Sequence, residues 1–243
     1  MNKLNLYKYT IKSLYTRGSS TLELAKATIH PRFDETEIEN RDTFQYCLDE
    51  YSDRFECEPK TIADWGCGIG RLMKPYSEAG MMIDGFDVSS NMLGFAQERF
   101  PGSNFYEVEP DGTLSETSHN QRIEYDYDLI YSFLVLQHNC NRYLRLHNLE
   151  NIERLLSNKG LVIIQMVFQP NYNDVNDLHH KYNENAVSNT TNSLADCVIT
   201  KDTLGDVYQD FSLFFANVKF EFLPNISVDK FYHNHIIISA IKS

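Results

Sequence analysis

The sequence lacks the features that mark disulfide-rich, zinc-binding and membrane-spanning proteins. Its five cysteines are scattered, and none forms a Cys-x-x-Cys pair, which argues against a disulfide framework or a zinc site. The longest apolar runs, GLVIIQMVF and IIISAI, are too short to cross a bilayer. The first residues also lack the continuous apolar core of a signal peptide. We therefore expect a cytoplasmic protein without a metal ion or a membrane anchor.

Positive charge is also scarce. The chain has 22 lysines and arginines against 34 aspartates and glutamates, for a formal net charge of -12. Such a surface repels a phosphate backbone, and neither an Asn/Asp-Pro-Pro-Tyr stretch nor a Pro-Cys pair of base-modifying enzymes is present. The balance disfavours nucleic acid and leaves a small molecule or a basic protein as partner. It does not indicate the oligomeric state.

From residue 60 onward, short apolar runs alternate with helix-like segments, a pattern typical of β-α units on a parallel sheet. The pattern predicts strands at residues 61–66, 81–88, 104–109, 127–136 and 161–168. Helices are predicted at 71–80, at 89–100 and at 142–160, with glycines closing the first and last. Two final strands, 214–223 and 235–243, are expected to pair antiparallel at one edge of the sheet.

Two further segments stand apart from this alternation. Residues 1–59 read as mostly helical and predict an N-terminal cap on a domain that spans residues 60–243. An Asn-rich stretch at about 169–200 predicts a loop-rich insertion, and a helix is expected to follow it around residues 200–211.

The stretch DWGCGIGR, residues 64–71, carries the most informative pattern. Its glycines fall at 66, 68 and 70, whereas the dinucleotide fingerprint needs its third glycine where Arg71 stands. Asp64 precedes the turn, and a carboxylate about 4 Å from a phosphate costs roughly 4 kcal/mol at an effective dielectric near 20. Beside an ammonium group the sign of that interaction reverses. The turn therefore favours a cationic ligand without phosphate, and S-adenosylmethionine meets both conditions.

Asp87, about twenty residues further on, ends the next predicted strand, where nucleotide-binding units place the carboxylate that binds the ribose hydroxyls. With this second acid in view, five segments resemble successive motifs of the class I S-adenosylmethionine-dependent methyltransferases: IADWGCGIGR, GFDVSSNML, PDGTL, YDLIYSFLVLQH and IERLLSNKGLVIIQ. The resemblance implies an α/β fold: a Rossmann-like, seven-stranded, mostly parallel sheet with the last strand antiparallel, helices on both faces and a helical N-terminal cap.

The same resemblance assigns cofactor-binding roles to particular residues. The residues expected around the methionyl part are Asp64, Gly66, Cys67, Gly68, Gly70 and Arg71. Asp87 is expected at the ribose, and Val88, Met92, Asp111 and Gly112 are expected at the adenine. Ser132 and Phe133 are expected on the path to the transferred methyl group. Glu109 competes with Asp111 as the acid at the adenine edge. Trp65 is expected to pack beside the turn.

His138 is the candidate catalytic residue, because it follows the fourth strand near the expected methyl group and an imidazole can take a proton from a hydroxyl. The alternative role, shared by Gln137, is to hold the next helix through hydrogen bonds. His179 and His180 are surface loop residues or part of a lid, and the alternating His233 and His235 lack a third metal ligand.

The function predicted is methyl transfer from S-adenosylmethionine to a small molecule, with oxygen as the acceptor. Three alternatives stay open: a non-catalytic module that binds S-adenosylmethionine, a protein methyltransferase and, disfavoured by the glycine spacing, an NAD-dependent dehydrogenase.

Overall fold

The computed structural model describes residues 3–29, 36–115, 123, 126–170, 179–183, 196–223 and 234–243. Within these ranges the main sheet has the order β3-β2-β1-β4-β5-β9-β8. Its strands are β1 (Thr61–Trp65), β2 (Met82–Asp87), β3 (Phe105–Glu107), β4 (Tyr127–Phe133), β5 (Leu156–Phe168), β8 (Phe215–Leu223) and β9 (Asn234–Lys242). Strands β1 to β5 run parallel, and β9 is antiparallel to both β5 and β8. The predicted fold, with its antiparallel last strand, is confirmed.

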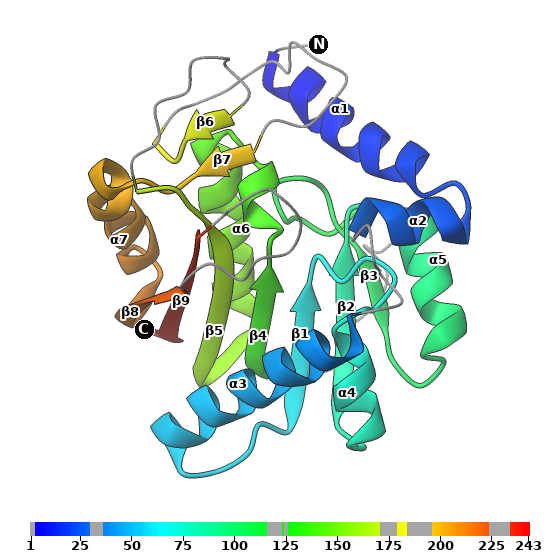
Figure 1. Cartoon of the computed structure of the whole chain (residues 1–243), viewed down its shortest axis with the longest axis horizontal. Coiled ribbons are helices and arrows are strands. Elements are labelled where there is room, and N and C mark those ends of the chain that lie inside the picture. Colours follow the sequence, from blue (N-terminus) through cyan, green and yellow to red (C-terminus); the bar gives the residue numbers. More distant parts are fainter. Residues whose placement is uncertain are drawn as a thin grey trace.

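Helices cover both faces of this sheet (Figure 1). The α-helices of the described residues are α1 (Lys3–Gly18), α2 (Leu22–Ile29), α3 (Glu37–Phe55), α4 (Met73–Glu78), α5 (Ser90–Arg99), α6 (Arg142–Leu155) and α7 (Leu204–Ser212). Side chains alternate along the strands, as a pleated sheet requires. Ile62 and Tyr131 pack with α3, α4 and α5, whereas Ala63 and Ile130 pack with α6 and α7. Strands β1, β2, β4, β5 and β9 are buried on both sides over most of their length, which explains their nearly continuous apolar sequences.

The N-terminal helices occupy two different places. Helix α3 crosses one face of the sheet (Figure 1), and its Cys47 and Tyr51 share a core cluster with β1 and β4. Helices α1 and α2 lie at the end of the sheet where the parallel strands end (Figure 1). Helix α3 therefore belongs to the core of the sheet domain. The division of the chain at residue 59 stays a prediction.

Two predicted helices end earlier than the sequence suggested. Helix α4 stops at Glu78, two residues before Gly80, which has a left-handed φ of 74°. Helix α6 stops at Leu155 rather than at Gly160, because Leu156 already pairs with Tyr127 of β4. The chain then bends through Lys159, whose φ is 66°. Long-range pairing with β4 therefore overrides the local helical pattern.

The described part of the insertion forms a second, two-stranded parallel sheet from β6 (His179–Lys181) and β7 (Asp196–Val198). This corrects the expectation of loop structure at His179 and His180. Buried Tyr182 and Cys197 anchor the segment to the core that contains α6. His233 lies outside the described residues, and the Nδ1 atom of His235 is 3.0 Å from the Gln165 amide nitrogen.

Gly70 provides a test of the turn that follows β1. Its φ is 77°, and a Cβ atom there would lie 2.5 Å from the Phe100 ring. Gly70→Ala is expected to lower the free energy of unfolding by about 1–3 kcal/mol, measured by urea denaturation. Gly94→Ala is the matched control, because a Cβ at this position of helix α5 meets nothing within 4 Å. It should stabilise the protein by about 0.5–1 kcal/mol, and equal stability of the two variants would contradict the strain at Gly70.

Candidate cofactor and acceptor site

A cavity of about 320 Å³ opens at the carboxyl ends of β1, β2 and β4, the usual place for ligands in open α/β sheets. Its walls come from the turn after β1, the ends of β2 and β3, residues 133–139 after β4, and helices α1 and α2. Of the predicted site residues, the following line it: Asp64, Gly66, Cys67, Gly68, Arg71, Asp87, Val88, Met92, Phe133 and His138.

The glycine turn is fixed by hydrogen bonds to β2. The backbone N–H groups of Gly66 and Cys67 donate to the Phe86 carbonyl at 2.7 and 2.9 Å. The Gly68 N–H donates to the Asp87 carboxylate at 2.9 Å. Gly66 has a φ of 84°, and a Cβ atom there would lie 2.3 Å from a methyl group of Val135. Only glycine lets the backbone pass this close to the segment after β4.

Asp64 and Asp87 stand at the ends of neighbouring strands and are both buried, at 3% and 7% exposure. Burial raises the pKa of Asp64 to about 7, against the opposing effects of Tyr131 and Arg71. Burial also raises the pKa of Asp87 to about 6, and backbone N–H groups, including those of Ser89 and Gly68, limit the rise. Desolvation disfavours the charged form of both acids, so a cation that enters the site would stabilise them.

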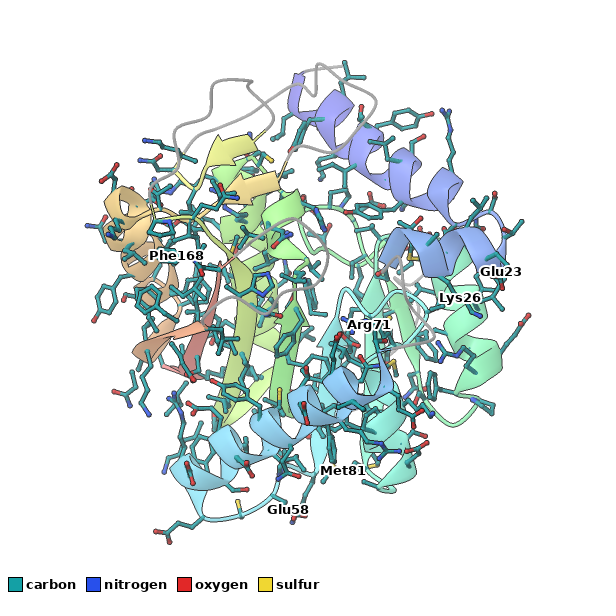
Figure 2. The ribbon with its side chains drawn as sticks, in the orientation of Figure 1. Glu23, Lys26, Glu58, Arg71, Met81 and Phe168 are labelled. Atoms are coloured by element: carbon teal, nitrogen blue, oxygen red, sulfur yellow. The ribbon has the colours of Figure 1, made fainter. Side chains whose placement is uncertain are left out.

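Arg71 lies between this cavity and a smaller surface pocket beside α3, near the centre of the molecule in Figure 2. Its guanidinium donates to the Asn40 side-chain oxygen at 2.6 Å. Desolvation lowers the pKa of Arg71, and Asp64 opposes that shift. This guanidinium is the one arginine or lysine side chain among the described residues that line the cavity.

Four predicted site residues do not line the cavity. The Ser132 hydroxyl is buried and donates to the Trp65 carbonyl at 2.8 Å. Gly70 packs against Phe100, and Gly112, at a φ of 84°, packs against Trp65 and Asn148. Asp111 faces helix α1 instead. Cys67 lines the cavity, but its N–H donates to the Phe86 carbonyl of β2, and its sulfur lies 2.7 Å from where a Cβ atom at Gly85 would stand. The expected roles of Ser132 and Asp111 therefore have no support in the geometry.

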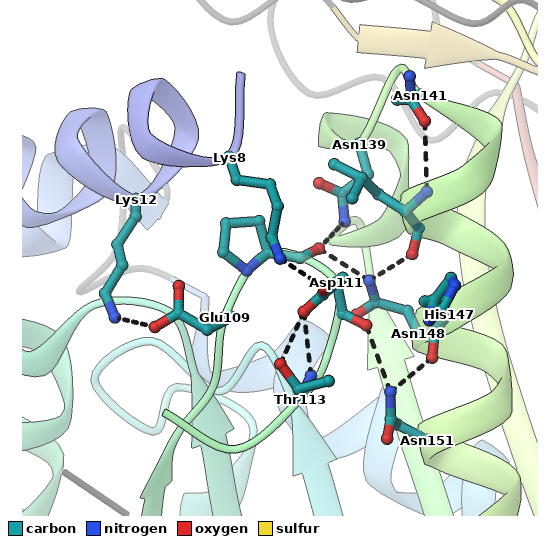
Figure 3. A network of polar contacts seen from close by, with 12 residues as sticks. Lys8, Lys12, Glu109, Asp111, Thr113, Asn139, Asn141, His147, Asn148 and Asn151 are labelled. Atoms are coloured by element: carbon teal, nitrogen blue, oxygen red, sulfur yellow. Dashed lines mark hydrogen bonds and ion pairs between the residues drawn. The ribbon is translucent and has the colours of Figure 1, made fainter. Parts of the chain in front are cut away.

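Both candidate acids after β3 form ion pairs with helix α1 (Figure 3). Lys8 contacts Asp111 at 2.5 Å, and Lys12 contacts Glu109 at 2.7 Å. Lys12 also contacts Glu107 at 2.7 Å. The cavity wall between these acids consists of Val108 and Pro110, and the side chains of Asn139 and Asn148 donate to the Pro110 carbonyl. This wall is apolar where the family pattern suggested a carboxylate.

The sequence did not single out Ile11, Tyr15 and Thr28, with which α1 and α2 supply one wall of the cavity. Helical spacing was the available signal: Tyr7, Ile11 and Tyr15 lie four residues apart and share one helix face. Tyr7 and Ile11 pack against Leu144 of α6. The Tyr7 hydroxyl accepts a hydrogen bond from the Cys140 N–H at 3.0 Å, so α1 contacts the segment that carries His138.

His138 lies in a single 3-10 turn, Leu136–His138, and faces the cavity. Its ring centroid is 5.8 Å from that of Tyr15. Gln137 also borders the cavity, but its side-chain oxygen accepts the backbone N–H of Val167 at 3.2 Å. This bond ties Gln137 to β5 rather than to the next helix. The helix-holding role considered for Gln137 and His138 and the catalytic role of His138 stay predictions.

Comparison with known proteins shows which proteins the chain resembles. A family model described as a methyltransferase domain matches residues 63–162. The resemblance to the class I S-adenosylmethionine-dependent methyltransferases is confirmed. Over 116 residues the chain is 28% identical to the candidate methyltransferase 235L of Invertebrate iridescent virus 6, which covers 46% of this chain and 40% of that relative. The chain therefore matches less than half of the length of this curated relative.

Solved structures share the fold at low identity. The magnesium protoporphyrin IX methyltransferase of Synechocystis PCC 6803, solved with bound S-adenosylmethionine, is 15% identical with a TM-score of 0.59, covering 98% of this chain and 97% of that one. The plantazolicin methyltransferase BpumL, solved with S-adenosylhomocysteine and a pentazolic desmethylPZN analog, is 14% identical with a TM-score of 0.62, covering 99% of this chain and 98% of that one. The N-methyltransferase NodS of Bradyrhizobium japonicum WM9 is 14% identical with a TM-score of 0.57, covering 96% of this chain and 98% of that one. Among the described residues of the present chain, no helix is long and apolar enough to cross a membrane.

The ion pairs of α1 predict a salt-sensitive attachment of this helix. Their side chains are 13–33% exposed, so each pair is expected to contribute roughly 1 kcal/mol at low salt. Lys8→Ala and Lys12→Ala should each speed amide hydrogen exchange in α1 about fivefold at low salt, and about 1 M NaCl should remove the difference.

Lys26→Ala is the matched control, because Lys26 pairs with Glu23 of the same helix, α2, at 3.6 Å. Exchange in α1 that ignores both the lysine substitutions and the salt would contradict a role for these ion pairs.

Proposed function

We propose that this chain is an S-adenosylmethionine-dependent methyltransferase that transfers a methyl group to an oxygen atom of a small molecule. The methyltransferase domain at residues 63–162 supports the reaction class. The observation that carries the cofactor is the pair of buried carboxylates, Asp64 and Asp87, beside a glycine turn in one cavity.

The residues present fit this cofactor on charge grounds. S-adenosylmethionine carries a sulfonium and an ammonium group, and it has no phosphate. Two buried acids whose charged forms lack solvation gain most from such cations. A diphosphate in the same cavity would face both carboxylates with Arg71 as the only described arginine or lysine of the lining, which disfavours the dehydrogenase alternative.

The roles of individual residues follow from their places in the cavity. In the proposal, Asp64 and the turn at Gly66 and Gly68 hold the methionyl part, and Arg71 binds its carboxylate. Asp87 binds the ribose hydroxyls. Five apolar or weakly polar side chains enclose the adenine: Trp65, Val88, Met92, Val108 and Pro110. Val108 and Pro110 stand where an acid was expected.

When bound, the cofactor supplies a methyl group attached to a sulfonium sulfur, and this sulfur is a good leaving group. The protein is left to align the acceptor, to exclude water and to accept a proton. His138 is the proposed general base, because it is a titratable side chain that faces the cavity beyond the two acids. Buried Ile11 and half-buried Tyr15 help to close the cavity above it.

Calorimetry with the purified chain tests the cofactor. S-adenosylmethionine and S-adenosylhomocysteine should both bind, and tighter binding of NAD would overturn the assignment. Methyl transfer to candidate acceptors then separates an enzyme from a non-catalytic binding module. Transfer to a basic protein in preference to small molecules would favour the protein methyltransferase alternative.

The raised pKa of Asp64 predicts how cofactor affinity changes with pH. At about pH 6 this carboxyl is mostly protonated, and a cation binds only after the proton leaves. Affinity for S-adenosylhomocysteine should therefore rise about eightfold from about pH 6 to about pH 7.5, with proton release detectable in buffers of different ionisation enthalpy.

Asp64→Asn should weaken binding tenfold or more and flatten most of this pH dependence. The matched control is Asp53→Asn at an exposed position of α3, which should behave as the unchanged protein. An Asp64→Asn variant that keeps the full pH dependence would refute the assignment of Asp64 as the titrating group.

His138→Ala is expected to lower kcat about 10²- to 10⁴-fold, the usual contribution of a general base, while the dissociation constant for S-adenosylhomocysteine stays within about twofold. Single-turnover methyl transfer and calorimetry measure the two quantities. Unchanged turnover would remove His138 from the mechanism and would leave the methyltransferase assignment intact.

A further inference from the structure

The cavity has two chemically different walls, and the second one bears on the acceptor. The first wall holds the turn after β1 and the ends of β2 and β3, with Asp64, Arg71 and Asp87 as its charged side chains. The second consists of α1 and residues 133–139 after β4. Its described lining residues are Ile11, Tyr15 and Phe133 together with Leu134, Val135 and the polar Gln137, His138 and Asn139.

The fixed charges of the cavity are balanced by the proposed cofactor alone. Among the described lining residues, two ionised carboxylates and one guanidinium leave a net charge of -1. S-adenosylmethionine, with a sulfonium, an ammonium and a carboxylate group, carries a net charge of +1. No permanently charged group of this lining remains for the acceptor, and an enclosed charge without a partner is strongly disfavoured. The acceptor therefore enters uncharged, which argues against carboxylates and alkylammonium compounds.

Three of the eight described residues of the second wall carry rings. Tyr15 and His138 face the cavity with ring centroids 5.8 Å apart, and Phe133, the last residue of β4, borders it. Such rings favour a flat aromatic partner, because stacked and edge-to-face pairs contribute beyond the area that they bury. The half-buried ring of Tyr15 is held by α1, which Lys8 and Lys12 fix to the turn after β3.

Acidity of the acceptor points the same way. In water a free imidazole and a phenol differ by roughly 3.5 pKa units, a gap that general-base catalysis bridges. Aliphatic hydroxyls have a pKa near that of water, about 16, so an imidazole deprotonates them far less readily. His138 is the one imidazole, carboxylate or amine side chain among the described residues of the second wall, so a phenol is the hydroxyl acceptor that matches it.

We propose that the acceptor is an uncharged phenol-class compound whose ring packs against Tyr15 and whose hydroxyl faces His138. This inference rests on the proposed function and narrows its substrate class. In the reaction the C–S bond of the sulfonium breaks with its electron pair staying on sulfur, and the phenolic oxygen forms the new C–O bond. The phenolic proton passes to His138 and then to solvent, so the products are an aryl methyl ether and neutral S-adenosylhomocysteine.

Four compounds of similar shape test the substrate class with the full chain: naphthol, its saturated analogue decalinol, naphthoate and naphthylmethylamine. With radiolabelled S-adenosylmethionine, kcat/KM for naphthol is expected to exceed that for each of the other three at least tenfold, and the label is expected on oxygen. Faster methylation of decalinol, naphthoate or the amine overturns the proposal.

Failure of naphthol to bind or to accept a methyl group, in protein that binds S-adenosylhomocysteine, also overturns it. Failure of S-adenosylhomocysteine to bind overturns the proposed function itself. The two failures are therefore distinguishable in one set of titrations.

Tyr15→Ala tests the proposed ring contact. It should raise KM for naphthol about fivefold while the dissociation constant for S-adenosylhomocysteine stays within about twofold. Tyr9→Ala is the matched control, because Tyr9 lies on the same helix, is 61% exposed and does not line the cavity. If Tyr15→Ala leaves KM for naphthol unchanged, or weakens both ligands equally, Tyr15 does not select the acceptor.

Discussion

The burial of two carboxylates at neighbouring strand ends is the constraint on which the site depends. Asp87 is compensated from within the protein, since the N–H groups of Gly68 and Ser89 donate to its two oxygens. Asp64 has weaker compensation, from Tyr131 and Arg71, and its pKa is raised further. A protein that buries an acid in this way loses stability unless a cation completes the site. The incomplete compensation of Asp64 thus links the fold to the charge of the ligand.

The glycine turn exists in this form because β1, β2 and the segment after β4 meet within a few ångströms. Its N–H groups bind the Phe86 carbonyl of β2, and Val135 occupies the space where a side chain at Gly66 would stand. Trp65 stacks on Phe86, with ring centroids 5.3 Å apart. The turn is therefore preorganised by packing on both sides, and a ligand that enters meets backbone already in place.

The sequence was sufficient to predict the structure where its determinants are local. These cases are the alternating strands, the glycine turn and the position of Asp64 and Asp87 in one cavity. It was insufficient where a distant partner decides. Asp111 was expected at the adenine, but a lysine 103 positions earlier in the chain pairs with it. Ser132 was expected on the methyl path, but the carbonyl of Trp65 accepts its hydroxyl. The early end of α6 likewise depends on pairing between Leu156 and Tyr127, which no local pattern reveals.

Helix α1 links these long-range features to the second wall of the cavity. Acids after β3 give a negatively charged edge, and Lys8 and Lys12 on α1 pair with it. The apolar face of the helix packs on α6, and the Tyr7 hydroxyl accepts the Cys140 N–H, two residues beyond His138. One helix thereby orients both the Tyr15 ring and the segment that carries His138. Because α1 contributes neither carboxylate, substitutions in α1 can change the second wall of the cavity while Asp64 and Asp87 stay in place.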